Sequence, residues 1–200
     1  MPFDPTSTAI ESRIILAAID CIEKYGMQGA TNRKIAEAAG VNSAAINYYF
    51  RSKDVLLQRV MEFTLKNAFD WEDIDRLPGG SAAERCKAVF NDLIAGGTRY
   101  PGITRAHFYD LLTAGDYSSL AVERLNQFIA RLADDLQARG AGLPPDELRL
   151  GLGQIASAAV MMILAPRLFA GGLGLDLTDE VARRAFVDRL VDRLLTRSMA

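Results

Sequence analysis

The stretch TNRKIAEAAGVNSAAINYYFRSK, residues 31–53, has the pattern of two short helices joined by a tight turn. Ala36 provides the small residue that is needed where two such helices cross. Gly40 suits a turn position with positive φ, because glycine has no Cβ to clash there. Val41 and Ile46 supply apolar anchors for the second helix. This spacing predicts a helix-turn-helix.

The second helix of the pair, from about Asn42 to Phe50, has one face suited to a DNA groove. Asn42 can cap its first turn, and Ile46 and Phe50 lie on its inward side. The outward side carries short or planar residues and no Lys or Glu: Ser43, Ala44, Asn47 and Tyr48. In the major groove an asparagine can pair with adenine and an alanine methyl can touch a thymine methyl. We therefore expect Ser43, Ala44 and Asn47 to face bases.

Positive charge gathers around the same segment. Residues 31–59 hold five basic and two acidic side chains, a balance of +3, whereas the whole chain has a net charge of −2. The five basic residues are Arg33, Lys34, Arg51, Lys53 and Arg59. A local basic surface on an acidic protein is typical of a duplex-binding face, although an ordinary solvated face would give the same count. The overall charge excludes a protein that binds nucleic acid through general positive charge.

The residues from Thr31 to Leu56 resemble the DNA-binding domain of the tetracycline-repressor (TetR) family. The family pattern is roughly T-x-x-x-I-A-x-x-A-G-V-S followed by L-Y-Y-H-F-x-S-K-E-x-L, and this chain has Ile35-Ala36, Ala39-Gly40-Val41, Ile46-Asn47-Tyr48-Tyr49-Phe50 and Ser52-Lys53-Asp54-Val55-Leu56. Among the departures from it, Asn42 stands where the family often has Ser, Asn47 replaces the first Tyr, and Tyr49 replaces the His. The motif covers about a quarter of the chain.

The resemblance implies a DNA-binding role for five residues of this segment. It implies phosphate contacts for Thr31, Tyr48 and Lys53, and less directly for Tyr49. It implies a groove-edge or phosphate contact for Arg33. The full predicted DNA-binding set is Thr31, Arg33, Lys34, Asn42, Ser43, Ala44, Asn47, Tyr48, Tyr49 and Lys53.

The periodicity elsewhere is helical, so we predict an all-α protein of about nine helices with no strand. Residues 1–52 form a three-helix DNA-binding head, and residues 53–200 form a ligand-binding and dimerisation domain. We expect capping boxes of Thr8 with Glu11 and of Ser81 with Glu84, and helix caps at Ser52, Asp116 and Thr178. The first helix should end at Gly26 and Gly29. Further helices are expected from Ile103 to Thr113 and from Pro145 to about Phe169, with a loop from Gly171 to Gly174.

The family resemblance also implies a pocket for a small effector inside the C-terminal domain. The candidate lining residues are aromatic or apolar, together with the single histidine: Trp71, Phe90, His107, Phe108, Leu111 and Phe128. Each of them could equally be a plain core residue. A lone histidine cannot make a multi-histidine metal site, so we expect His107 to be a polar contact in the pocket or a satisfied core residue. The effector would be a small apolar or amphipathic molecule.

The last two helices are apolar enough to need a partner. We predict that they pair with a second copy in an isologous four-helix interface, as in the family. The residues expected there are Ser157, Met161, Leu164, Phe186, Leu190 and Leu194. In such a dimer the two recognition helices would lie about 34 Å apart, which matches successive major grooves of a palindrome.

Several other classes are disfavoured. Cys21 and Cys86 belong to no CxxC or Cys/His cluster, so we expect neither a disulfide scaffold nor a zinc site, and a reduced cytoplasmic setting. The start of the chain has no signal-peptide pattern. The uncharged stretch from Gly151 to Pro166 is shorter than a membrane span, and we interpret it as a buried helix or a helix–helix interface. Asp70, Glu72, Asp73 and Asp75 could bind a cation but fit a solvated helix end better.

Together these features predict a dimeric DNA-binding transcriptional regulator that represses from a palindromic operator and is released by a small molecule. We expect no cofactor and no enzymatic activity. One alternative is a small helical enzyme that uses His107 with Asp110 or Asp116, but no nucleophile elbow, phosphate loop or metal signature supports it. A second alternative is a helical carrier or interaction module that binds a ligand without DNA. Steep loss of duplex binding with rising salt would identify the regulator.

Overall fold

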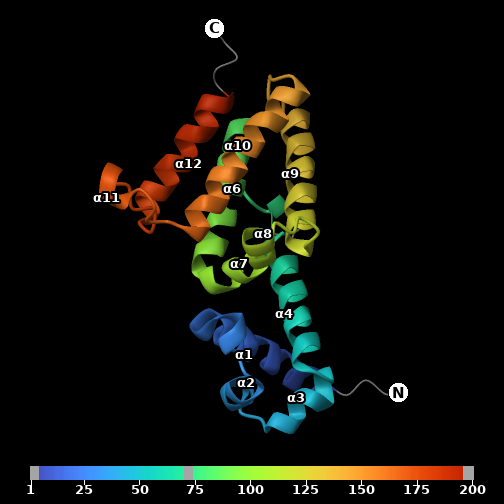
Figure 1. Cartoon of the computed structure of the whole chain (residues 1–200). Coiled ribbons are helices and arrows are strands. Elements are labelled where there is room, and N and C mark those ends of the chain that lie inside the picture. Colours follow the sequence, from blue (N-terminus) through green and yellow to red (C-terminus); the bar gives the residue numbers. More distant parts are fainter. Residues whose placement is uncertain (1–4, 70–73, 196–200) are drawn as a thin grey trace.

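The computed structural model describes residues 5–69 and 74–195, and all regular structure in these ranges is helical. They hold eleven helices, nine of them with seven or more residues, so the predicted all-α class and helix number are confirmed. Figure 1 shows a head of N-terminal helices at one end and a body formed by the later helices above it. The helix α4 (Lys53–Ala68) runs from the head into the body (Figure 1).

The head is built from α1 (Pro5–Gly29), α2 (Asn32–Ala39), α3 (Ser43–Phe50) and the beginning of α4. The apolar sides of these helices meet in one core, in which Ile14, Ile35 and Ile46 are fully buried. α1 is kinked at Gly26, whose φ of 71° is accessible to glycine, and one further turn runs to Gly29. The core holds α2 and α3 in a fixed orientation on the end of α1.

The body has a second core between α6 (Ala82–Arg99), α9 (Leu120–Ala138), α10 (Pro145–Leu164) and α12 (Glu180–Leu195). Phe90, Leu132 and Leu148 are fully buried there. α7 (Pro101–His107) and α8 (Tyr109–Ala114) lie between this core and the head (Figure 1). The short α11 (Ala170–Leu173) projects from the side of the body.

A buried arginine ties the loop before α6 to α9. Arg85 is 1% exposed and donates from Nε to Asp135 Oδ2 at 3.0 Å and from Nη2 to Asp75 Oδ1 at 3.2 Å. Its Nη1 donates to the backbone oxygens of Ile74 and Leu77 at 2.7 and 3.0 Å. Because a buried charge is tolerated only when it is paired and hydrogen-bonded, this network accounts for its position.

Two connections join the head to the body. α4 places Leu56 and Val60 in the head core, and Phe69 directly after it packs against the body core. The second connection is a carboxylate: Glu23 of α1 accepts from the backbone N–H of Gly102 at 2.9 and 2.8 Å and from that of Ile103 at 3.1 Å. These two donors open α7, so α7 is fastened directly to the first helix of the head.

Several helix boundaries differ from the sequence prediction. α1 begins at Pro5, before Thr8, because proline suits the first turn of a helix. The single helix expected from Ile103 to Thr113 is two helices, α7 and α8, which Phe108 separates. α10 ends at Leu164 and not near Phe169, and α11 occupies part of the expected loop from Gly171 to Gly174.

Two predicted caps are wrong because a neighbouring residue takes the role. Ser119 caps α9 by accepting from Val122 N, while Asp116 Oδ1 accepts from the backbone and hydroxyl of Ser118. Asp179 caps α12 by accepting from Ala182 N at 2.7 Å, and Thr178 bonds Asp176 instead. The caps at Asn42 and Ser52 and the capping box of Ser81 and Glu84 are confirmed.

Among the described helices, α10 alone is long and apolar enough to cross a membrane, with a mean hydropathy of 1.4 over its most apolar window. Eight of its residues are buried against the rest of the protein, including Leu148, Leu152 and Ile155. A core helix passes the same test of length and composition. The burial of one face of α10 agrees with its interpretation as a core helix.

Candidate nucleic-acid interface and effector cavity

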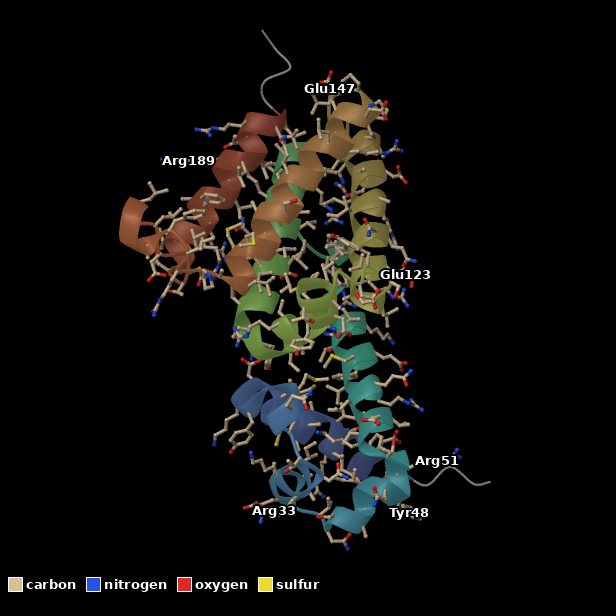
Figure 2. The ribbon with its side chains drawn as sticks, in the orientation of Figure 1. Arg33, Tyr48, Arg51, Glu123, Glu147 and Arg189 are labelled. Carbon is tan, nitrogen blue, oxygen red and sulfur yellow. The ribbon has the colours of Figure 1, made fainter. Side chains whose placement is uncertain are left out.

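The start of α2 presents an exposed cap and an exposed arginine. Thr31 Oγ1 accepts from Lys34 N at 3.4 Å, which leaves the exposed hydroxyl proton available to another acceptor. Arg33 is exposed and lies at the head end of the molecule (Figure 2). Lys34 is more restrained, because its Nζ donates to Gly29 O at 3.2 Å and lies 3.9 Å from the centre of the Tyr25 ring.

The turn between α2 and α3 has the predicted geometry. Gly40 has φ 64° and ψ 38°, a left-handed conformation that glycine adopts without strain. Val41 N donates to Ala36 O at 2.9 Å, which closes the end of α2. Arg13 of α1 holds the same end by donating to Ala39 O at 2.6 Å. Asn42 then begins α3 by accepting from Ala45 N at 2.9 Å.

The outward side of α3 is exposed among the residues that the structure describes. Ser43, Ala44 and Asn47 are exposed, and Tyr48 is 80% exposed. The opposite side is anchored by Ile46 and Phe50 in the head core, at 0% and 2% exposure. The split between an open polar side and a buried apolar side is the one expected for a helix that enters a groove.

Tyr49 and Lys53 border this face and are both half-buried. The Tyr49 ring packs edge-on against Tyr48, with centroids 5.0 Å apart and an interplanar angle of 88°. Lys53 is the first residue of α4, directly after the Ser52 cap. All ten predicted DNA-binding residues thus lie around α2, α3 and the start of α4, at the same end of the molecule.

Sequence reasoning counted Arg51 among the basic residues but did not place it at the interface. It is exposed, lies near Tyr48 at the tip of the head (Figure 2), and ends α3 with φ 66°. A positive φ is uncommon for a residue with a side chain and costs free energy that glycine would not. The combination of strain, exposure and positive charge makes Arg51 a further candidate for a phosphate contact.

Comparison with known proteins agrees with this geometry. Residues 14–60 match the family model described as bacterial regulatory proteins, tetR family. The head of the chain therefore carries the TetR-family DNA-binding segment. Residues 14–60 include most of α1, all of α2 and α3, and the first half of α4. Because this family consists of regulatory proteins, we set the enzymatic alternative aside.

The sequence relatives match only part of this chain. The HTH-type transcriptional regulator BetI of Klebsiella pneumoniae (strain 342) is 35% identical over 79 residues, which is 38% of this chain and 40% of BetI. The likeness to solved structures extends over the whole fold. A putative TetR-family regulator from Mesorhizobium loti superposes with a TM-score of 0.71 at 17% identity, covering 97% of this chain and 98% of that one. FadR from Bacillus subtilis, in complex with stearoyl-CoA, has a TM-score of 0.61 at 19% identity, covering 94% and 99%.

The body of the TetR-family fold contains an apolar cavity of about 80 Å³. Its walls come from α4, α6, α7, α9 and α10, together with Phe108 between α7 and α8. Two of the candidate effector-binding residues, His107 and Phe108, line it. Phe90 and Phe128 belong to the core and do not line this cavity, and Phe128 supports the lining residue Phe69 with ring centroids 5.3 Å apart. Leu111 is also outside the lining, and Trp71 lies outside the described residues.

His107 combines the two roles that the sequence left open. It lines the cavity, and its Nε2 lies 2.9 Å from the Thr64 hydroxyl of α4. Burial lowers the pKa of the His107 imidazole to about 4, so the ring is neutral at pH 7. No sequence signal pointed to Thr64, because it is 43 residues away along the chain.

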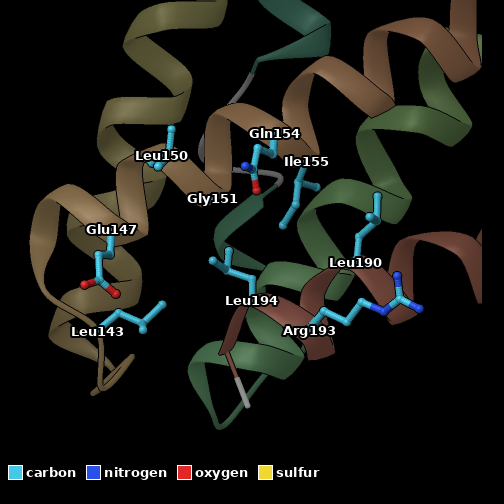
Figure 3. Close-up of a pocket in the computed structure, with 9 residues that line it drawn as sticks. All are labelled: Leu143, Glu147, Leu150, Gly151, Gln154, Ile155, Leu190, Arg193 and Leu194. Atoms are coloured by element: carbon cyan, nitrogen blue, oxygen red, sulfur yellow. The ribbon is translucent and has the colours of Figure 1, made fainter. Parts of the chain in front are cut away.

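The predicted dimer residues lie around two grooves on the face formed by α10, α12 and the segment between them. One groove, of about 560 Å³ between α10 and α12, is lined in part by Leu190 and Leu194 (Figure 3). The other, of about 290 Å³, is lined in part by Ser157, Met161 and Phe186. Leu164 lines neither.

The remaining candidate chemistry is weak. Both cysteines are buried, and burial raises the pKa of each thiol, that of Cys86 to about 12. A thiol with so high a pKa is a poor nucleophile at pH 7. Within residues 5–69 and 74–195 no group of three or more His, Cys, Asp or Glu side chains could hold a metal ion. Of the predicted acidic cluster, Asp70, Glu72 and Asp73 lie outside these ranges.

Proposed function

We propose that this protein is a dimeric transcriptional repressor of the TetR family that binds a palindromic operator and is released by a small effector. The observation that carries the proposal is the outward side of α3. Its side chains are short or planar, exposed and uncharged, and they are held by a buried anchor on the opposite side. Such a helix fits the major groove, and the basic residues at its borders fit the flanking phosphates. A protein of this kind works where the chromosome is, in the cytoplasm.

Each residue of the head has a distinct proposed role. Ser43, Ala44 and Asn47 face base edges, where a good side-chain pair discriminates against the wrong base by about 1–3 kcal/mol. Thr31, Arg33 and Tyr48 bond phosphates. Lys53 adds a charged phosphate contact beside the N-terminus of α4, which itself favours an anion. Lys34, Asn42 and Tyr49 support these groups, because each already has a partner within the head.

The dimer would form through α10 and α12. Their outer face is unusually apolar for a free surface, with Leu150 at 68% and Met161 at 46% exposure beside the two grooves. Gly151 already serves packing within the protomer, since a Cβ there would overlap the Leu194 side chain. Gly153 has open space beside it and leaves room for a second helix. A stable interface needs about 800 Å² from each partner, which a pair of such helices can supply.

The effector would act from the apolar cavity. Its walls include α4 and α7, and these are the two elements that connect the body to the head. A ligand that favours one separation of these walls favours one position of the head, and it acts only by that difference in affinity. The FadR neighbour, solved in complex with stearoyl-CoA, supports a ligand-binding role for this fold.

Selection of bound duplexes from a random pool, followed by fluorescence anisotropy against salt, tests the proposal. The double variant Tyr48→Ala, Lys53→Ala should lose operator binding while sedimentation still shows a dimer. Lys53→Ala alone should lower the steepness of the log–log salt dependence by about 2 for a dimer, since each phosphate contact contributes about 0.9. Lys66→Ala, an exposed lysine elsewhere on α4, is the matched control and should change neither. Unchanged affinity in the double variant contradicts the DNA-binding role.

The dimer has its own test. Met161→Glu would place a charge on the exposed apolar side of α10 without entering the core. It should shift the protein to a monomer in sedimentation and weaken operator binding. Asp146→Lys is the control, because the Asp146 side chain is 98% exposed at the far end of the same helix and lines neither groove. A wild-type protein that sediments as a monomer contradicts this part of the proposal.

A further inference from the structure

The described residues that line the effector cavity include no charged side chain. The lining is aliphatic and aromatic except for Thr104 and His107, and His107 is neutral at pH 7. An ion that enters such a site loses its hydration and finds no counter-charge, so its binding is strongly disfavoured. The lining therefore favours a neutral occupant.

The hydrogen bonds of Thr64 determine what His107 can offer to that occupant. We assign the one proton of the Thr64 hydroxyl to its own helix, where Val60 O and Met61 O lie 2.9 and 3.2 Å from Oγ1. The hydroxyl can then only accept from His107 Nε2, 2.9 Å away, so Nε2 carries the ring proton. In a neutral imidazole this leaves Nδ1 as an acceptor. The polar group of a matching ligand must therefore be a hydrogen-bond donor.

The size of the cavity limits the rest of the molecule. Its volume of about 80 Å³ is below the ~150 Å³ of a protein cavity that holds benzene. A single ring fits only if the walls move apart slightly, and a much larger body does not fit. The cavity is limited by close packing between α6 and α10. A Cβ added to Gly97 of α6 would lie only 2.6 Å from Ile163 Cδ1 of α10.

We propose that the effector is a compact neutral molecule with an apolar body and one hydrogen-bond donor, of the class of phenols and small alcohols, whose donor bonds Nδ1 of His107. This inference rests on the proposed function, since it names the chemistry of the effector in that function. Thr64 acts as a positioning residue, because it holds the imidazole in the tautomer that accepts.

Calorimetric titration of the full chain with four single-ring probes tests the inference: phenol, toluene, benzoate and benzylammonium. Phenol should bind about 2–10-fold more tightly than toluene, which is the range expected for one net neutral hydrogen bond. Benzoate and benzylammonium should bind at least tenfold more weakly than phenol. Charged probes that bind as well as phenol overturn the inference, and so does the absence of phenol binding at millimolar concentration.

Variants separate the hydrogen bond from general packing. His107→Phe should remove the preference for phenol over toluene, whereas His107→Gln retains an acceptor and should preserve part of it. Thr64→Val should weaken the preference by releasing Nε2. Thr113→Val is the matched control, because the Thr113 hydroxyl makes the same bond to its own helix, to Tyr109 O at 2.8 Å, but is exposed on α8 away from the cavity. A preference that survives in both His107→Phe and Thr64→Val refutes the role of His107.

The outcome for the ligand class is distinct from that for the proposed function. Phenol that binds but leaves the anisotropy of operator DNA unchanged supports the ligand class and contradicts the effector role. Suppose instead that a charged molecule releases the operator from the wild-type protein but not from the variant Ala159→Leu, in which the added side chain fills the cavity. That result supports the effector role and contradicts the ligand class. Circular dichroism of each variant shows whether the fold is intact. If His107→Phe does not fold, Thr64→Val decides.

Discussion

The carboxylate of Glu23 should control how tightly the head is held to the wall of the effector cavity. It accepts three short hydrogen bonds from the first N–H groups of α7, which carries His107 at its other end. A hydrogen bond to a charged group contributes about 1.5–3 kcal/mol, and an anion at a helix N-terminus gains further from the helix dipole. Glu23→Gln keeps one acceptor oxygen but loses the negative charge. The NH2 group of the glutamine side chain would face the backbone N–H donors of α7. Since Glu23 is half-buried, we expect a local loss of about 1.5 kcal/mol.

Hydrogen exchange at the N-terminus of α7 measures this loss directly. A loss of that size corresponds to roughly tenfold faster exchange of the Gly102 and Ile103 amides if they exchange by local opening. Glu62→Gln is the control, because Glu62 is exposed on α4 and, among the described residues, bonds only the Gln58 side chain, at 3.0 Å. Gly102→Ala provides a second approach to the same contact. A Cβ there would lie 2.9 Å from Glu23 Cα, so the two helices would be pushed apart.

The same variant should weaken communication between effector and operator. Coupling free energies in allosteric proteins are typically 1–3 kcal/mol, so a loss of 1.5 kcal/mol at the junction can remove much of the response. Anisotropy titrations of operator DNA, with and without effector, give the coupling in both proteins. If exchange at Gly102 is unchanged, the hydrogen bonds contribute little in solution. If exchange rises but the coupling is unchanged, Glu23 has a structural role alone, and the reasoning about communication through α7 is refuted.

Three other substitutions give independent outcomes. Arg51→Gly should raise the free energy of unfolding by up to about 1 kcal/mol, because glycine accepts φ 66° without strain. It should also weaken operator binding, because the positive charge is lost. An operator affinity equal to that of the wild type contradicts a phosphate contact of Arg51. Arg85→Met should lower the free energy of unfolding in urea by about 3 kcal/mol, since it leaves the oxygens of Ile74 and Leu77 without their donor. The free energy of unfolding should also fall as the pH drops from about 6.5 toward 4. The His107 imidazole has a lower pKa in the folded protein than in the unfolded chain, so unfolding takes up a proton in this range. This uptake lowers the free energy of unfolding by up to ~1.4 kcal/mol per pH unit. His107→Gln should remove that part of the pH dependence, and a slope identical to wild type would contradict the lowered pKa.

The head was predictable because its signals are local. Gly40, Asn42 and Ser52 each act on the backbone within three residues, so their positions in the sequence determine their positions in the structure. The inward and outward sides of α3 follow from helical periodicity over eight residues, and Ile46 and Tyr48 lie where that periodicity places them. The strain at Arg51 was not predictable, since a positive φ for arginine has no sequence signature.

The body was predictable only in outline. Neighbouring residues compete for the same role at the start of a helix, so Ser119 and Asp179 serve as caps where Asp116 and Thr178 were expected. The cavity draws its walls from five helices, and periodicity cannot separate a residue that lines it from one that packs beside it. Phe90 and Phe108 have the same chemistry, yet only Phe108 meets the cavity.

In the proposed function, the small size of the cavity would link effector binding to the release of DNA. An occupant the size of one ring needs more room than about 80 Å³, so it prefers a conformation in which the walls stand farther apart. Two of those walls are anchored in the head, α4 through Leu56 and Val60 and α7 through Glu23. A preference of 1.4 kcal/mol for the wider conformation lowers operator affinity tenfold if that conformation misplaces the two heads. Cavity-enlarging Ile163→Ala removes the need to widen, so it should retain ligand binding and lose the effect on DNA; a variant that keeps both shows that the effector acts by some other route than the separation of α4 and α7.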